Sequence, residues 1–171
     1  MQQDKLCYYS KSKNVIAGKG VHEFVNDPLM YNELNKIHNW RQILSNFYIE
    51  PFLYEGKSYN SIEHAFQAQK IKLVDINKAE YFTINSGHLI GIGNGSIAQK
   101  NRKLVLLNNE QLKHWDNIKF QIMKNITIAR ISQSSIYKNV LKLTQNAELW
   151  HIIERKDIVR NKYMEDLRNN L

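Results

Sequence analysis

A carboxylate, an aromatic ring, an amide and an amine recur at helical spacing near the middle of the chain, in Glu63, Phe66, Gln67 and Lys70. Residues at i, i+3, i+4 and i+7 share one face of an α-helix. On such a face the carboxylate can transfer protons, the amine can attack an electrophile, the amide can bind polar substrate atoms and the ring can stack. The same spacing also fits a solvated helix face with weak i,i+4 pairs, so spacing alone leaves both interpretations open.

Other short motifs do not complete a known chemical signature. Glu63-His64 lacks the first histidine of the HExxH zinc helix. The glycines at 91, 93 and 95 lack the GxGxxG spacing and a surrounding βαβ unit, so we expect a flexible loop there. Gly18-Lys19-Gly20 is too short for a phosphate-binding Walker A loop. It can still lend N–H groups and Lys19 to a phosphate, or serve as a basic turn.

The composition is that of a globular, basic protein. The chain has 171 residues, of which 43% are hydrophobic and 23% charged, which excludes a disordered or low-complexity chain. Its net charge of +8 fits an anionic partner such as nucleic acid or a phosphorylated small molecule, and equally fits ordinary solubility charge. The single cysteine, Cys7, and the lack of an apolar leader or an apolar run of membrane-spanning length lead us to expect an intracellular protein without a membrane partner.

Periodicity and capping residues predict a mainly α, single domain over residues 1–171 with one small β-hairpin. The elements expected are an extended segment from Tyr8, a hairpin over 44–59 turning at Glu55-Gly56, and helices over 62–74 (capped by Ser61), 77–84, 97–107, 109–129 and 162–171. A further helix, capped by Ser134 or Ser135, is expected to carry Ile136, Val140 and Leu143. In the longest of these helices, Trp115 begins the apolar stripe and Lys119, Lys124 and Arg130 form a basic side.

Several of these segments together resemble the signature of the NADAR (YbiA-like) family. Ser45-Asn46-Phe47 matches S-N-F, Gly56 lies in the hairpin that follows, and residues 63–70 match E-H-x-x-Q-A-x-K. Weaker landmarks follow in the family's order, namely Trp115 with Lys119 and Met123, Leu143-Thr144 with Glu148-Leu149, Asp157, and the helix from Asn161 to Arg168. The resemblance covers nearly the whole chain.

This resemblance implies a multihelical fold with a β-hairpin and an N-glycosidase activity on ribosyl compounds. Members of the family act on phosphoribosyl intermediates of riboflavin synthesis or on ADP-ribose attached to guanine, including ADP-ribosylated DNA. The resemblance implies no metal and no cofactor. It gives no indication of the oligomeric state.

For that reaction we assign candidate roles to named residues. Glu63 is the candidate acid or base, and Asp157 is the candidate carboxylate that stabilises the sugar cation or positions water. Lys70 is the candidate nucleophile or Schiff-base amine, and the alternative role for Lys70 is pairing with a substrate phosphate. Substrate-binding candidates are Asn46, Phe47, His64, Gln67 and Trp115, with Lys19, Arg102 and Arg130 as candidate phosphate ligands.

The chain departs from the family pattern near its end. The family's W-G-x-G stretch after the late Asp is replaced by Ile158-Val159-Arg160, and the acid expected after the L-x-T stretch corresponds to His151 or Glu154. This departure motivates a second hypothesis, in which the chain is a non-catalytic module that binds ADP-ribose or nucleic acid. A general nucleic-acid-binding protein is a third, for which the sequence contains no recognised motif.

Overall fold

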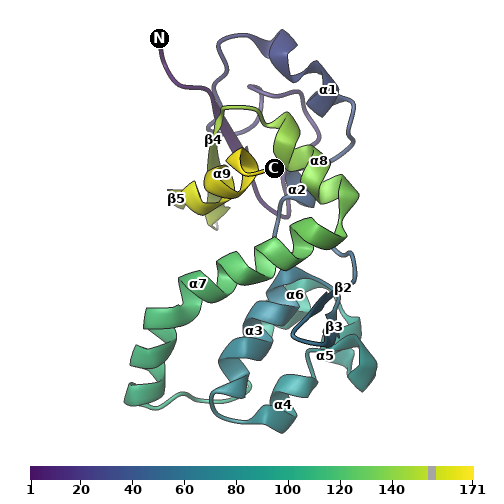
Figure 1. Cartoon of the computed structure of the whole chain (residues 1–171), viewed down its shortest axis with the longest axis vertical. Helices are drawn as coiled ribbons and strands as arrows, with labels where there is room; N and C mark the ends of the chain where they lie inside the picture. Colours follow the sequence, from purple (N-terminus) through teal and green to yellow (C-terminus); the bar gives the residue numbers. More distant parts are fainter. Residues whose placement is uncertain (154–156) are drawn as a thin grey trace. The chain divides into compact units, whose positions relative to one another are not determined.

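The computed structural model describes residues 1–153 and 157–171, and its backbone divides into two compact units (Figure 1). The central unit comprises residues 46–134, and the terminal unit comprises residues 1–45 and 135–171. The sequence predicts a single domain over residues 1–171. Within the described residues, no helix is both long and apolar enough to cross a membrane.

The central unit is a hairpin and a set of helices arranged around α3. Its elements are β2 (Phe52–Tyr54), β3 (Lys57–Tyr59), α3 (Ile62–Lys72), α4 (Ile76–Glu80), the 3₁₀ helix η2 (Ile84–Ser86), α5 (Leu89–Ile92), α6 (Gly95–Lys100) and α7 (Asn109–Gln133). Helix α3 packs against α4, α6 and α7, while β2 packs against α7. The long helix α7, green in Figure 1, therefore runs alongside both α3 and the hairpin.

Local sequence signals account for the hairpin and for α3. Glu55 and Gly56 have φ angles of 48° and 75°, and a two-residue turn with both φ values positive matches the twist of a hairpin. Phe52 pairs with Tyr59 across the two strands. Ser61 caps α3, because its hydroxyl accepts a hydrogen bond from the N–H of His64. The predicted turn and N-cap are thus confirmed.

The glycine-rich segment is not the loop that the sequence predicts, because it forms α5 and the start of α6. A Cβ on Gly91 would lie 2.0 Å from the Thr83 carbonyl oxygen, and a Cβ on Gly95 would lie 2.6 Å from the Cα of Phe47. These glycines therefore allow close packing of backbone rather than flexibility. The helices predicted over 77–84 and 97–107 end early, at Glu80 and Lys100.

The terminal unit contains a sheet that the sequence does not predict. Its elements are β1 (Lys5–Tyr8), η1 (Pro28–Tyr31), α1 (Asn32–Asn35), α2 (Trp40–Ile43), α8 (Ser135–Leu143), β4 (Glu148–Ile153), β5 (Asp157–Arg160) and α9 (Lys162–Asn169). The strand order is β1-β4-β5, with β1 parallel to β4 and β4 antiparallel to β5. The expectation of one hairpin as the only sheet structure is wrong, because β4 and β5 form a second antiparallel pair. Strand β1 joins it by a parallel pairing over a long sequence separation, which leaves no local signal.

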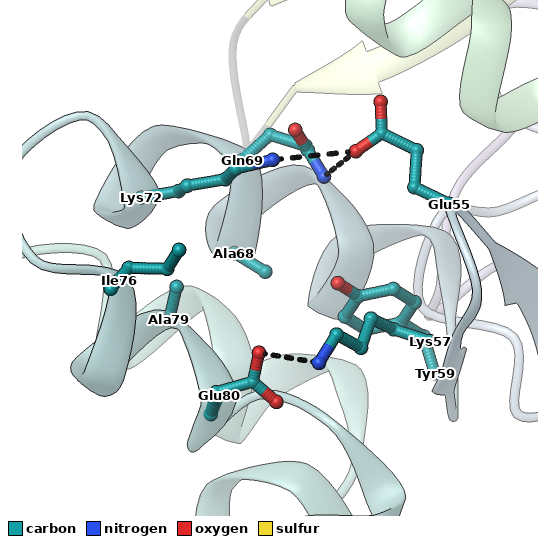
Figure 2. Close-up of a pocket in the computed structure, with 9 residues that line it drawn as sticks. All are labelled: Glu55, Lys57, Tyr59, Ala68, Gln69, Lys72, Ile76, Ala79 and Glu80. Carbon is teal, nitrogen blue, oxygen red and sulfur yellow. Dashed lines mark hydrogen bonds and ion pairs between the residues drawn. The ribbon is translucent and has the colours of Figure 1, made fainter.

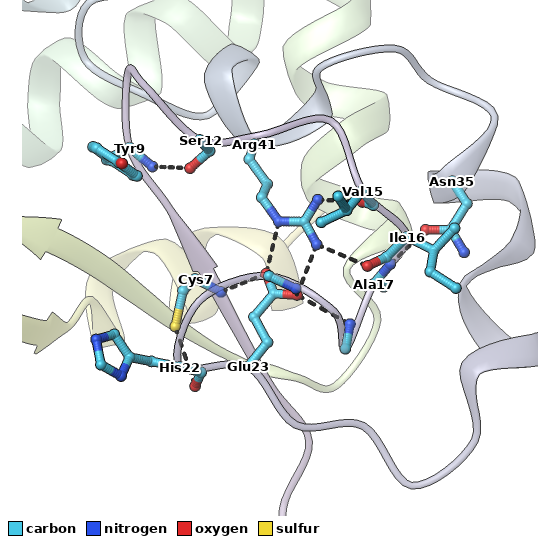
Figure 3. Close-up of polar contacts among 12 residues, drawn as sticks. Cys7, Tyr9, Ser12, Val15, Ile16, Ala17, His22, Glu23, Asn35 and Arg41 are labelled. Carbon is cyan, nitrogen blue, oxygen red and sulfur yellow. Dashed lines mark hydrogen bonds and ion pairs between the residues drawn. The ribbon is translucent and has the colours of Figure 1, made fainter.

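One buried ion pair organises the loop that follows β1 (Figure 3). Arg41 donates through Nε and Nη2 to the two carboxylate oxygens of Glu23, both at 2.7 Å, and both side chains are almost fully buried. The same carboxylate accepts the N–H groups of Cys7, Gly18 and Gly20 at 3.0–3.1 Å. A bidentate pair with its remaining lone pairs satisfied is a favourable way to bury a charge, so the loop has a defined shape.

Candidate functional site

The carboxyl group of Glu63 lies buried at the start of α3. The backbone N–H of Glu63 donates a hydrogen bond to the carbonyl of Asn46 at 2.9 Å, which connects the first turn of α3 to the segment before the hairpin. Its side-chain Oε1 accepts a hydrogen bond from Nε2 of Gln67, one turn along the helix, at 2.8 Å. The i,i+4 spacing noted in the sequence therefore produces a real contact between these two side chains.

Burial changes the protonation of Glu63. Loss of solvent raises the pKa of this carboxyl above its ordinary value, while the hydrogen bond from Gln67 and the positive charge of Arg102 partly oppose the rise. A carboxyl with a raised pKa keeps its proton closer to neutral pH than an exposed glutamate does. Glu63 is therefore suited to act as a general acid.

The amide of Gln67 is only partly satisfied. Its Oε1 is fully buried and has no hydrogen-bond partner among the described residues, and the residue as a whole is 5% exposed. A buried polar atom without a partner costs free energy, and such atoms are uncommon in folded proteins. The orphaned oxygen belongs to the amide that contacts the buried carboxyl of Glu63, and a bound molecule with an N–H or O–H group would supply its missing donor.

Lys70 follows one turn after Gln67 and is half-buried. Burial is the main cause that lowers the pKa of its amine, and the positive charges of Arg102, Lys103 and Lys119 lower it further, opposed by Asp116. A lysine with a lowered pKa has a larger neutral fraction and can act as a nucleophile.

An aromatic pair flanks this helix face. The rings of Phe66 on α3 and Trp115 on α7 have centroids 5.0 Å apart and planes tilted by 52°. Trp115 is 4% exposed, so it serves the packing of α3 against α7, and its neighbour Phe66 is partly exposed. Apolar walls beside a carboxyl and an amine keep water out and strengthen electrostatic interactions.

Asn46 and Phe47, both predicted to bind substrate, lie next to this face. The amide of Asn46 is 3.7 Å from the sulfur of Met123 on α7, and its carbonyl accepts the N–H of Glu63. Phe47 packs directly on Gly95, the first residue of α6. Asn46 therefore positions the start of α3 and Phe47 the start of α6, and both residues are partly exposed.

His64 is placed differently from its neighbours, in the core of the central unit. Its Nε2 donates to the carbonyl of Ile90 at 2.9 Å, which leaves Nδ1 to accept from the Ser61 hydroxyl at 2.7 Å. Burial lowers the pKa of the ring, with the bond to Ile90 opposing, so the neutral form is favoured. With both nitrogens engaged, the ring holds α3 to α5, which favours a structural role over the predicted contact with substrate.

The candidate phosphate ligands separate into different environments. Arg102 is exposed and close enough to Glu63 and Lys70 to affect the pKa of both. Arg130 is 1% exposed, pairs with Glu50 at 3.2 Å and lies over the ring of Phe52 at 4.5 Å, so its charge is already bound within the central unit.

The remaining candidates belong to the terminal unit. Lys19 is exposed, and the N–H groups of Gly18 and Gly20 on either side of it already donate to the Glu23 carboxylate rather than being available to a phosphate. Asp157 is exposed at the start of β5. Of the two candidates for the late acid, His151 lies on β4 and stacks on Tyr8, and Glu154 lies outside the described residues.

Lys103 and Asp116 are not among the site residues that the sequence predicts, yet both affect Lys70. Both act on the charge of that amine, together with Lys119, which pairs with Asp116 at 2.6 Å. A signal was available, since Lys103 adjoins Arg102 and Asp116 adjoins Trp115. In the described part of the chain, no group of three or more His, Cys, Asp or Glu side chains is arranged to hold a metal ion.

A small pocket of about 140 Å³ lies on another face of α3, between the hairpin and α4 (Figure 2). Ala68, Gln69 and Lys72 line it from α3, and ion pairs of Lys57 with Glu80 and of Lys72 with Glu55 cross its rim. Its charges are mutually paired, and it includes none of the predicted site residues.

Comparison with known proteins bears on the fold. No family model matches the sequence, and no curated protein matches it. The solution structure of the E. coli protein YbiA matches with a TM-score of 0.58 and 22% identity over 76% of this chain and 77% of that chain. The chain has a YbiA-like fold. The fold implied by the sequence resemblance is thereby confirmed at the level of backbone architecture, and the YbiA likeness leaves activity and substrate to be inferred from the site.

Proposed function

We propose that the chain is an N-glycosidase that hydrolyses the N-glycosidic bond of a phosphorylated ribosyl compound. The observation that carries the proposal is the buried Glu63 carboxyl, hydrogen-bonded to Gln67 and one further turn from the partly buried amine of Lys70. The resemblance of residues 45–70 to the NADAR signature and the YbiA-like fold both support it.

In the simplest mechanism Glu63 is the acid. Its proton passes to the leaving nitrogen as the bond between C1 of the ribosyl group and that nitrogen breaks, leaving positive charge on the sugar. Water then adds to C1 and gives a proton back to the Glu63 carboxylate. The products are the free base and ribose bearing its phosphate group, and the carboxyl is regenerated.

Lys70 offers a covalent variant of the same reaction. Its neutral amine bonds to C1 as the protonated base leaves, and opening of the sugar ring gives a protonated imine. Water adds to the imine carbon, the bond from C1 to Nζ breaks, and the sugar leaves as its aldehyde form. The pKa of Lys70 is lowered by burial and by neighbouring cations, which supports this role.

The surroundings are suited to a phosphorylated substrate. Arg102, with Lys103 beside it, supplies exposed positive charge near the reacting groups, and Trp115 with Phe66 supplies an apolar wall for a base. We propose ADP-ribose on guanine, free or in DNA, as the first substrate class, and a phosphoribosyl intermediate of the riboflavin type as the second. The role of Asp157 remains the one predicted from the sequence.

A hydrolysis panel analysed by mass spectrometry tests the proposal. It contains ADP-ribosylated guanosine, ADP-ribosylated DNA, a phosphoribosylaminopyrimidine and NAD. We expect release of free base from at least one phosphorylated ribosyl compound, and loss of that release in Glu63→Gln. A folded, pure protein that releases base from none of them contradicts the proposal.

One observation favours a second candidate function, a non-catalytic module that binds ADP-ribose. Residues 158–160 lie in strand β5, where the family pattern has its Gly-rich stretch. Tight binding of ADP-ribose by calorimetry, without base release from any substrate of the panel, would decide for this candidate.

A further inference from the structure

The orphaned oxygen of Gln67 limits what can bind beside Glu63. Because Oε1 is buried and accepts no hydrogen bond within the described residues, a ligand that seals this position must offer an N–H or O–H group. A ligand group without a donor would leave the oxygen buried and unpaired. The position beside Oε1 of Gln67 therefore favours ligand groups that donate a hydrogen bond.

The contact with Glu63 fixes which atom of the amide is presented. Oε1 of Glu63 accepts the hydrogen bond from Nε2 of Gln67, so Oε1 of Gln67 is turned away from the carboxyl group. Ionisation of Glu63 reinforces this orientation, because a carboxylate can only accept hydrogen bonds. In the proposed reaction Glu63 becomes ionised as its proton moves to the leaving nitrogen. Oε1 of Gln67 is thus held in place as a hydrogen-bond acceptor when positive charge develops on the sugar.

We infer that Oε1 of Gln67 accepts a hydrogen bond from the 2-hydroxyl of the ribosyl group, and so selects ribosyl over 2-deoxyribosyl substrates. The inference rests on the proposed function. Glu63 acts at C1, and the hydroxyl nearest to that reaction centre is the one on the adjacent carbon. Gln67 contacts Glu63 directly, so its amide is the neighbouring group placed to meet that hydroxyl. Hydrogen bonds to the 2-hydroxyl strengthen in the transition state of glycoside cleavage.

This selection has a practical consequence for a nucleic-acid substrate. A guanine in DNA that carries ADP-ribose has two N-glycosidic bonds, one to ribose and one to deoxyribose. Only the ribose offers a 2-hydroxyl to Gln67. The chain is thereby directed to the bond that removes the modification, and the bond that holds the base in DNA stays intact.

The test compares two substrates in three proteins. The substrates share one leaving base and one phosphate group and differ only in the 2-hydroxyl. The proteins are the wild type, Gln67→Met, which keeps the chain length without the acceptor, and Gln69→Met as a matched control on another face of α3. We expect the wild type and Gln69→Met to favour the ribosyl substrate in kcat/KM by roughly 10- to 100-fold. In Gln67→Met that ratio falls toward one, mainly through loss of activity on the ribosyl substrate.

Hydrolysis with a ratio near one in the wild type overturns the inference and leaves the proposed function standing, and this arm needs no variant to fold. A ratio in Gln67→Met equal to that of the wild type overturns it as well.

If the wild type hydrolyses neither substrate, the proposed function fails. Binding of ADP-ribose and of its analogue lacking the 2-hydroxyl on the terminal ribose then tests Gln67 alone. Tighter binding of ADP-ribose that disappears in Gln67→Met supports the inference, and equal or absent binding of the two ligands overturns it.

Discussion

The rings of Phe66 on α3 and Trp115 on α7 pack in a tilted arrangement, with centroids 5.0 Å apart and planes inclined by 52°. This contact joins the helix that carries the reactive side chains to the longest helix of the central unit. Aromatic pairs in this geometry add stabilisation beyond the apolar area that they bury.

Replacing Trp115 by Ala removes one of the large buried side chains of the central unit. We expect a loss of about 3–5 kcal/mol in the free energy of unfolding, measured by urea denaturation. Trp115→Phe should lose less, because it keeps a ring against Phe66. Equal stability of Trp115→Ala and the wild type would contradict the packing described above.

The raised pKa of Glu63 predicts a pH effect on stability. A carboxyl whose pKa is higher in the folded state contributes stability below its ordinary value of 4.5, and that contribution is lost as pH rises through the folded pKa. Glu63→Gln removes the buried charge that forms at higher pH. We expect the variant to exceed the wild type in urea midpoint at pH 8, and the difference to shrink toward pH 4.

The same group governs catalysis in the proposed reaction. The wild-type kcat/KM should fall as pH rises through the folded pKa of Glu63, because the acid loses its proton. Glu63→Gln should lower kcat by about 10²- to 10⁴-fold and abolish that limb of the profile. A Glu63→Gln variant that is more stable and equally active would remove Glu63 from the mechanism.

Borohydride trapping tests the covalent role of Lys70. If the amine forms an imine with the opened ribose, reduction during turnover leaves a stable adduct that peptide mass spectrometry assigns to Lys70. Lys70→Ala should give no adduct and little turnover, while Lys72→Ala, a lysine paired with Glu55 on another face of α3, serves as the control. Near-normal turnover in Lys70→Ala, or no adduct with active wild type, excludes the covalent route.

His64 should make stability fall on acidification. Its pKa is lowered in the folded state, so its contribution is complete above the ordinary value of 6.5 and is lost as pH falls through the folded pKa. His64→Gln loses at least one of the bonds to Ser61 and Ile90, and we expect about 1–3 kcal/mol of destabilisation at pH 7.5. Thermal unfolding between pH 5 and 7.5 should therefore show a smaller pH dependence in the variant.

Removing the charge of Arg102 should mainly change KM, whereas removing the charge of Arg130 should mainly change stability. Arg102→Gln removes an exposed cation near Lys70, so KM for a phosphorylated substrate should rise severalfold and become less sensitive to salt, with the unfolding midpoint unchanged. Arg130→Gln breaks a buried pair with Glu50, so it should mainly lower the midpoint. Equal effects of the two variants on KM would argue that Arg130 also reaches the substrate.

The sequence predicted the parts of the structure that depend on neighbouring residues. The Glu55-Gly56 turn, the Ser61 cap and the long helix containing Trp115 all rest on signals within a few residues, and all three are found. The contact of Glu63 with Gln67 is of the same kind, because helical spacing alone brings them together.

Features that depend on distant partners escaped prediction. Strand β1 is recognisable only through its parallel pairing with β4, and the glycines at 91 and 95 are explained only by Thr83 and Phe47 packed against them. Similarly, no local pattern shows that His64 is bonded to Ile90 or that Arg130 is bonded to Glu50. His64 and Arg130 differ from exposed substrate-binding residues in their burial and in their hydrogen-bond partners. Burial and partners are both set by tertiary structure.

The order in which the two units can form follows from how the chain is divided between them. The central unit is one continuous segment, residues 46–134, and all its helices and its hairpin are available once that segment has left the ribosome. Strand β1 precedes the central unit in the sequence and pairs with β4, which follows that unit, so β1 remains unpaired until the central unit has been synthesised. The terminal unit therefore depends on pairing over a long sequence separation, which slows folding, and the edge of β1 stays open to other strands until β4 is available.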